Sequence, residues 1–388
     1  MFDRLFKIFS SLRLTVICLG FGLILVFLGT LAQVHEGLYL AQHRWFRSFF
    51  VYWEPGNGSI KIPIFPGGYL VGSVLLVNLI TAHVKRFQAT WKKLGIHIIH
   101  AGLILLLIGQ LATDLLSKET TMRFGEGETR KFSESSLHNE LVFLTDSDTP
   151  NEDLVVSIPD TMLKANEEIR HPHLPFAVRV KDYQINARVR PRGPMVDKGP
   201  PPATRGAGVD LALLPVPETR DPDERNFPSA VIELFGAQGS LGTWLVATAM
   251  NETQEIKVGD KTWRIAFRWQ REYLPFTVQL LKMTYEEYPG SGIPKNFQSR
   301  VRIENPKRNE NREVDIYMNN PLRYEGLTFY QYQMGRDELD SNRGSSTLQV
   351  VRNPGWLTPY AGCMMVGGGM VIQFLMHLIG FITKRRAK

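Results

Sequence analysis

Three histidines lie close together in the sequence, at the apolar edges of a short basic segment. His83 precedes this segment, and His97 and His100 follow it, within NLITAHVKRFQATWKKLGIHIIHAGLILLLIG. A neutral imidazole can be a metal ligand or an axial ligand of haem iron. At the edge of an apolar segment it can equally hydrogen-bond a lipid headgroup or a backbone carbonyl. Both interpretations stay open for each histidine taken alone.

Apolar segments on both sides of the basic stretch predict the helices that position these histidines. Residues of about 66–84 and 94–115 carry almost no charge, and each segment is long enough to cross about 30 Å of hydrocarbon. Segments of about 14–33 and 356–383 have the same character. We therefore predict four transmembrane helices, three near the N-terminus and one at the C-terminus.

The third apolar segment has two distinct faces. Gly95, Gly102 and Gly109 recur every seven residues, which places them on one side of a helix and lets a second helix approach closely. The polar residues of this segment lie on the face away from the glycines: His97, His100, Gln110 and Asp114. One face is therefore predicted to pack against a neighbouring helix, and the other to point towards something polar.

A fourth histidine, His377, lies near the end of the last apolar segment, so four histidines are predicted at one depth. Polar side chains in a membrane are costly and are functional candidates by default. Arg86 follows His83 by three residues on the same helix face, where a guanidinium can reach haem propionates. A haem site at this depth is one prediction, and we predict no catalytic residue.

The formal net charge is +7, and many of the basic residues flank the apolar segments. They lie before the first segment, between the second and third, and after the fourth: Arg4, Lys7, Arg13, Lys85, Arg86, Lys92, Lys93, Lys384, Arg385, Arg386 and Lys388. By the positive-inside rule all three places are cytoplasmic, and 117–355 lies outside. This distribution indicates a membrane protein and argues against nucleic-acid binding.

The region 117–355 contains short runs rich in Val, Ile, Phe, Tyr and Thr, separated by turn residues. This pattern predicts an all-β sandwich or barrel-like domain, or two of them. The stretch 186–227 is rich in Pro and Gly and is predicted to be a long loop or a partly disordered insertion.

The predicted organisation has an N-terminal membrane region at 1–116, an outer domain, and a C-terminal span with a basic tail at 356–388. Cys18 and Cys363 are the two cysteines, and both lie in predicted spans. The outer domain therefore has no disulfide and no cysteine-based metal site, and its own core must stabilise it.

The chain resembles the ResB (CcsB) family of cytochrome c maturation, known as system II. The resemblance is carried by NLITAHVKRF followed by KLGIHIIHAGLILLLIG, by NPLRYEGLTFYQ within 313–335, and by LQVVRNPGWLTPYAG at 348–362. The layout of three spans, a large outer domain and a final span also matches.

This resemblance implies a polytopic partner of the ResC (CcsA) type, which together with this chain carries haem b across the membrane and joins it to apocytochrome c. It implies that His83 ligates the haem, with His100 as the second choice. The tryptophan-rich motif of the partner is absent, so we expect a non-catalytic or co-catalytic subunit of a haem lyase complex. The expected location is the bacterial inner (plasma) membrane, or a thylakoid membrane.

Two other functions remain open at this point. The chain could be a structural scaffold or an apocytochrome chaperone whose histidines bind no haem. It could also be a redox subunit of the b-type cytochrome class, which would hold haem stably without a partner. The haem content of the purified protein, with and without its partner, distinguishes the three.

Overall fold

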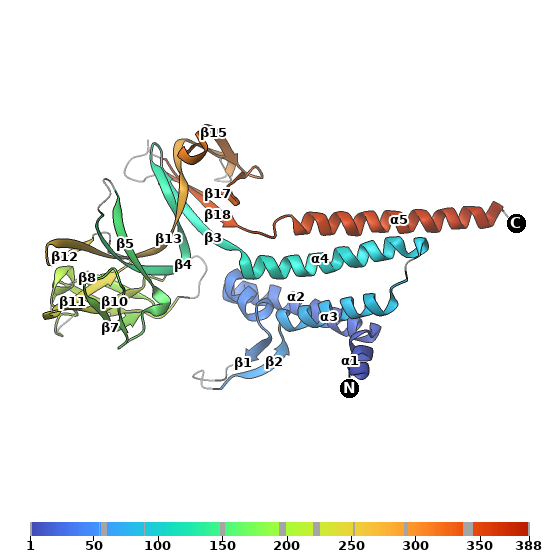
Figure 1. Cartoon of the computed structure of the whole chain (residues 1–388), viewed down its shortest axis with the longest axis horizontal. Coiled ribbons are helices and arrows are strands. Elements are labelled where there is room, and N and C mark those ends of the chain that lie inside the picture. Colours follow the sequence, from blue (N-terminus) through green and yellow to red (C-terminus); the bar gives the residue numbers. More distant parts are fainter. Residues whose placement is uncertain are drawn as a thin grey trace. The chain divides into compact units, whose positions relative to one another are not determined.

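The computed structural model divides into two compact units, which we call the helical unit (2–117 and 353–386) and the β unit (118–219 and 226–352) (Figure 1). The structure describes all residues except 1, 54, 56–59, 89, 148–151, 194–198, 220–225, 251–252, 291–293, 337–343 and 387–388.

Four helices of the helical unit are long and apolar enough to cross a membrane, as predicted. They are α2 (Leu12–Ala41), α3 (Gly68–Arg86), α4 (Leu94–Leu116) and α5 (Thr358–Arg386). Three short helices accompany them: α1 (Phe2–Phe9), the π-helical η1 (Gln42–Phe46) and the 3-10 helix η2 (Trp91–Lys93).

A two-stranded hairpin, which the sequence pattern did not predict, connects α2 and η1 to α3. Strand β1 (Phe50–Trp53) pairs antiparallel with β2 (Ile62–Pro66). The second apolar helix, expected at about 66–84, spans Gly68–Arg86, because the proline at position 66 belongs to β2.

Helices α4 and α5 pack against each other through glycines, as the seven-residue spacing predicted. A Cβ atom on Gly95 would lie 2.6 Å from the carbonyl oxygen of Gly369, and one on Gly102 would lie 2.9 Å from that of Gly362. Gly109 is also buried. Since the paired glycines run in opposite directions along the two helices, one antiparallel seam holds α5 on α4 (Figure 1).

The β unit is all-β, as predicted, and its described helical turns are short 3-10 segments: η3 (Asp160–Met162), η4 (Gly206–Val209) and η5 (Pro306–Arg308). A ten-stranded sheet follows the order β15-β14-β13-β4-β3-β18-β17-β16, with β12 paired to β13 and β5 to β4. A second sheet has the order β11-β10-β7-β6.

The strand bounds of the ten-stranded sheet are β3 (Lys118–Gly125), β4 (Thr129–Asp146), β5 (Asp153–Pro159), β12 (Gln254–Val258), β13 (Lys261–Glu287), β14 (Pro294–Asn305), β15 (Glu310–Tyr317), β16 (Leu322–Tyr324), β17 (Leu327–Arg336) and β18 (Gly344–Arg352). Those of the four-stranded sheet are β6 (Glu168–Ile169), β7 (Ala177–Gln184), β10 (Ser229–Gly236) and β11 (Gly239–Ala247).

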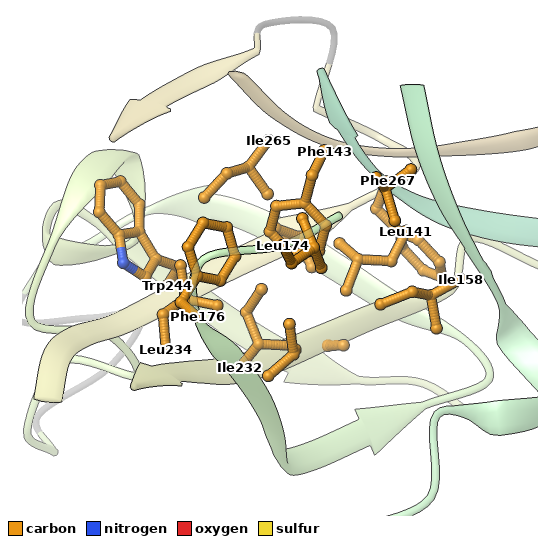
Figure 2. Packing of buried hydrophobic residues seen from close by; sticks show 14 of the residues in the cluster. Leu141, Phe143, Ile158, Leu174, Phe176, Ile232, Leu234, Trp244, Ile265 and Phe267 are labelled. Carbon is orange, nitrogen blue, oxygen red and sulfur yellow. The ribbon is translucent and has the colours of Figure 1, made fainter. Parts of the chain in front are cut away.

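Two hydrophobic cores stabilise the β unit. The first lies between the four-stranded sheet and one part of the large sheet (Figure 2). In this core the rings of Phe143 and Trp263 each make an edge-to-face contact with Phe176. The second surrounds Phe276 and Phe329 in the other part of the large sheet. The long strands β4 and β13 pair with each other in both parts and so join the two cores.

The stretch 186–227 is not a loop throughout, so that prediction was wrong in part. Strand β8 (Ala187–Pro191) pairs antiparallel with β9 (Leu211–Pro215). Apolar side chains of both strands pack on a small cluster that includes buried Leu245, so burial orders these short strands despite the Pro- and Gly-rich chain between them. Residues 194–198 and 220–225 of this stretch lie outside the described part of the chain.

Candidate functional site

The structure brings three of the predicted histidines together at the end of α3 and the beginning of α4. The ring of His83 lies 5.1 Å from that of His97 and 5.5 Å from that of His100, measured between centroids. Helix periodicity places His97 and His100 one turn apart on α4, and the reversal of the chain at η2 sets α3 beside them. We call these three residues the histidine cluster.

His83 and His100 contact each other through one nitrogen of each ring. Their Nδ1 atoms are 3.4 Å apart, so one ring donates to the other. The donor of this pair keeps its lone pair on Nε2, where it can bind a metal.

His97 has the arrangement of a supported metal ligand. Its Nε2 lies 2.9 Å from the carbonyl oxygen of Gln88 and must be the donor, which leaves the lone pair on Nδ1. That Nδ1 is buried and has no hydrogen-bond partner in the described part of the chain. The ring of Phe87 lies 4.7 Å from the His97 ring and fixes its orientation. A ligand histidine typically donates its other N–H to a carbonyl in this way.

The contact between His83 and His100 leaves the two rings unequal. Both Nδ1 atoms take part in the contact, and only the ring that donates at Nδ1 keeps a lone pair on Nε2. The pair therefore offers one imidazole nitrogen to a metal. Among the described residues, no group of three or more potential metal ligands is arranged around a common point.

His377 is not part of the histidine cluster. Its Nε2 lies 2.9 Å from Nε2 of Gln373, one turn earlier on α5, and Gln373 in turn reaches the carbonyl oxygen of Lys92. His377 therefore belongs to the same end of the helical unit but contacts a different set of groups.

Arg86 ends α3 next to the cluster. Its side chain is exposed and forms no hydrogen bond or ion pair with a described residue. Lys85, by contrast, donates to the hydroxyl of Ser10 at 2.9 Å. Arg86 is thus a basic group beside the cluster that is available to an anion.

A second polar group lies at the opposite end of α4 and was only partly visible in the sequence. Asp114 forms an ion pair with Arg47, with 2.6 Å between the carboxylate oxygen and Nε, and accepts a hydrogen bond from the Tyr69 hydroxyl. The sequence placed Asp114 on the polar face of its helix. It gave no sign of the partners, which come from the segment after η1 and from the start of α3.

Comparison with known proteins places this chain beside one family. Residues 231–343, which lie in the β unit, match the model of the ResB-like family. The predicted resemblance to this family is confirmed over that part of the chain. A segment of 111 residues is 30% identical to Protein NrfI of Wolinella succinogenes, and covers 29% of this chain and 12% of NrfI. The matched region is therefore a small part of that relative.

Proposed function

We propose that this chain, which resembles the ResB family, is a subunit of the system II cytochrome c synthetase. In this proposal it receives haem b as cargo at the cytoplasmic side of the membrane and presents it, with a ResC/CcsA-type polytopic partner, for attachment to apocytochrome c. The ResB-like match supports a role in cytochrome c biogenesis. The observation that carries the haem step is the histidine cluster beside Arg86.

Charge supports the proposed orientation in the bacterial inner membrane. The turn between α3 and α4 carries Lys85, Arg86, Lys92 and Lys93, and α5 ends in basic residues. The positive-inside rule puts these ends in the cytoplasm and the β unit on the opposite side.

Cysteine labelling tests this orientation. In a background without Cys18 and Cys363, Lys164→Cys in the β unit should react with a membrane-impermeant maleimide in intact cells. Lys93→Cys in η2 should react only after the cells are lysed. The reverse pattern would contradict the orientation.

The residues of the cluster have distinct parts in the proposed haem contact. His83 would bind the iron through Nε2 while its Nδ1 is held by His100. Arg86 would pair with a propionate, and Phe87 gives an apolar surface for the porphyrin. Because the cluster suits one imidazole ligand, the second axial ligand would come from the partner.

Single alanine variants, co-expressed with a ResC-type partner, test the haem step. His83→Ala should lower the haem retained by the purified complex and the yield of holocytochrome c at least about tenfold, a change that corresponds to about 1.4 kcal/mol. Added imidazole should restore part of both. His377→Ala, outside the cluster but at the same end of the unit, is the matched control and should retain haem.

The same experiment separates the alternatives. If His97→Ala loses haem and His83→Ala does not, the ligand is His97, whose Nδ1 is free. If each of the three alanine variants of the cluster leaves both haem and holocytochrome unchanged, the chain is a scaffold and the proposed haem step is wrong. Stable haem in the chain purified without a partner would instead indicate a b-type redox subunit.

A further inference from the structure

A cavity of about 580 Å³ lies in the helical unit at the end away from the histidine cluster. It is lined by the C-terminal part of α2, by η1, by the beginning of α3 and by the C-terminal part of α4. Pockets of about 300–1,000 Å³ typically hold small organic ligands. The proposed haem step uses none of the residues that line this cavity.

The charged groups of the cavity neutralise each other. Asp114, whose side chain is 9% exposed, is paired with Arg47 and accepts a hydrogen bond from Tyr69. A carboxylate and a guanidinium at 2.6 Å leave no net charge for an ion to pair with. The cavity wall therefore disfavours a phosphate or a carboxylate ligand.

Three amide side chains line the same cavity without hydrogen-bond partners among the described residues. They are Gln33 of α2, Gln42 of η1 and Gln110 of α4. An amide both donates and accepts hydrogen bonds and carries no charge. All three residues are exposed in the chain taken alone, so a ligand in the cavity can reach their amides. In a membrane such groups are costly unless a ligand or water satisfies them.

The remaining wall is mostly aliphatic, with Leu38, Leu76, Leu107 and Leu111 contributed by α2, α3 and α4. Haem fits poorly here, because the described lining residues include no histidine, cysteine or methionine and no unpaired cation. The combination of aliphatic walls with neutral amides instead suits a flat, uncharged ring that carries oxygen atoms at its rim.

We propose that this cavity binds the head group of a membrane quinone or quinol. The ring would lie between the leucines, and its oxygens would accept from the amides of Gln33 and Gln110 and, in the quinol, donate to their carbonyl oxygens. The apolar tail of such a molecule remains in the hydrocarbon that surrounds the helices. This proposal rests on the cavity alone and is independent of the proposed haem step.

Two glycine substitutions test the site by filling it. Gly72 lines the cavity, and a Cβ atom there would meet no heavy atom within 4 Å, so Gly72→Leu puts its side chain into the empty space. Gly22 on α2 has equally open surroundings but does not line the cavity. Gly22→Leu therefore adds the same volume to a membrane helix elsewhere.

The measurement is equilibrium binding of decylubiquinone to the full-length chain in lipid nanodiscs. We expect saturable binding to the wild type, at least about tenfold weaker binding to Gly72→Leu, and binding within about twofold of wild type for Gly22→Leu. Gln110→Leu should also weaken binding, whereas Gln373→Leu, whose amide lies outside the cavity on α5, should not.

Decanol has the same tail length as decylubiquinone but no ring. Competition between the two shows whether the cavity binds the ring or the tail. If decanol competes as well as decylubiquinone, the cavity holds an acyl tail and the proposal is wrong. Absence of saturable binding to the wild type, or equal binding to both glycine variants, would also overturn it. A photoreactive quinone should label residues of the cavity wall in the wild type and not in Gly72→Leu.

Discussion

The two units of this protein are packed by opposite means. In the helical unit, α4 and α5 meet where side chains are absent, so that Gly102 lies against the backbone of Gly362. In the β unit, the cores are filled by large rings such as Phe143 and Phe276, which are 0% and 1% exposed. Apolar side chains gain nothing by leaving lipid for another helix, whereas in water their burial drives folding.

The two units also differ in how they accommodate polar groups. Inside the helical unit the buried Asn78 donates to the carbonyl oxygens of Phe9 and Ser11, where α1 ends and α2 begins. In the β unit, ion pairs such as Arg300 with Asp315 lie on the surface. Water solvates surface charges at little cost, whereas a buried polar group such as Asn78 needs hydrogen-bond partners.

Truncation of a core ring should have the largest effect. Phe143→Ala removes a fully buried ring of the first core and should lower the free energy of unfolding of the β unit by about 3–5 kcal/mol. Denaturant unfolding of the full-length chain in detergent, followed by intrinsic fluorescence, measures it. Leu137→Ala, at a 56% exposed position of the same strand, should change stability by less than about 0.5 kcal/mol.

In the helical unit, a side chain added at a glycine of the α4–α5 contact should lower stability. Gly102→Leu forces a side chain against the Gly362 carbonyl and Val366, and should destabilise the α4–α5 pair by about 1–3 kcal/mol. Gly368→Leu on α5 meets open space and is the control. Titration with sodium dodecyl sulfate, followed by circular dichroism, measures this destabilisation. Equal stability of the two variants would mean that the glycine seam does not hold the helices together.

The smallest effect should come from surface charge. The guanidinium of Arg300 holds the pKa of the Asp315 carboxyl below its ordinary value of 3.8. The ionised pair therefore stabilises the folded state above that pH, and this contribution is lost as the pH falls through the lower pKa of the folded protein.

Asp315→Asn should reduce this pH dependence, with an effect below about 1 kcal/mol at neutral pH. Unfolding measured at several pH values below 4 in the wild type and the variant gives the difference. Asp260→Asn, at an exposed turn with no ion pair to a described residue, should leave the pH dependence unchanged.

Local patterns determined a large part of the structure. Four apolar segments predicted four long helices, and the glycine spacing predicted the face of α4 that packs on α5. Alternating short runs predicted the β unit. These predictions succeeded because hydrophobic periodicity reports which face of one element is buried, and that depends on residues near in sequence.

Other features were decided by contacts between distant residues. The pairing of β8 with β9 depends on an apolar surface that includes Leu245, far along the chain. The sequence pointed to His83, His97 and His100 as a group, but which nitrogen of each is free depends on the carbonyl of Gln88 and on the ring-to-ring contact.

The sequence by itself thus determined which segments are apolar, which faces pack, and which family the chain resembles. Only the tertiary structure showed that Arg47 and Tyr69 meet Asp114, and that a cavity with unpartnered amides lies beside them. The physical reason is that periodicity predicts the burial of a side chain from its neighbours in the chain. A hydrogen-bond partner or an empty volume is set by how separate helices come together in space.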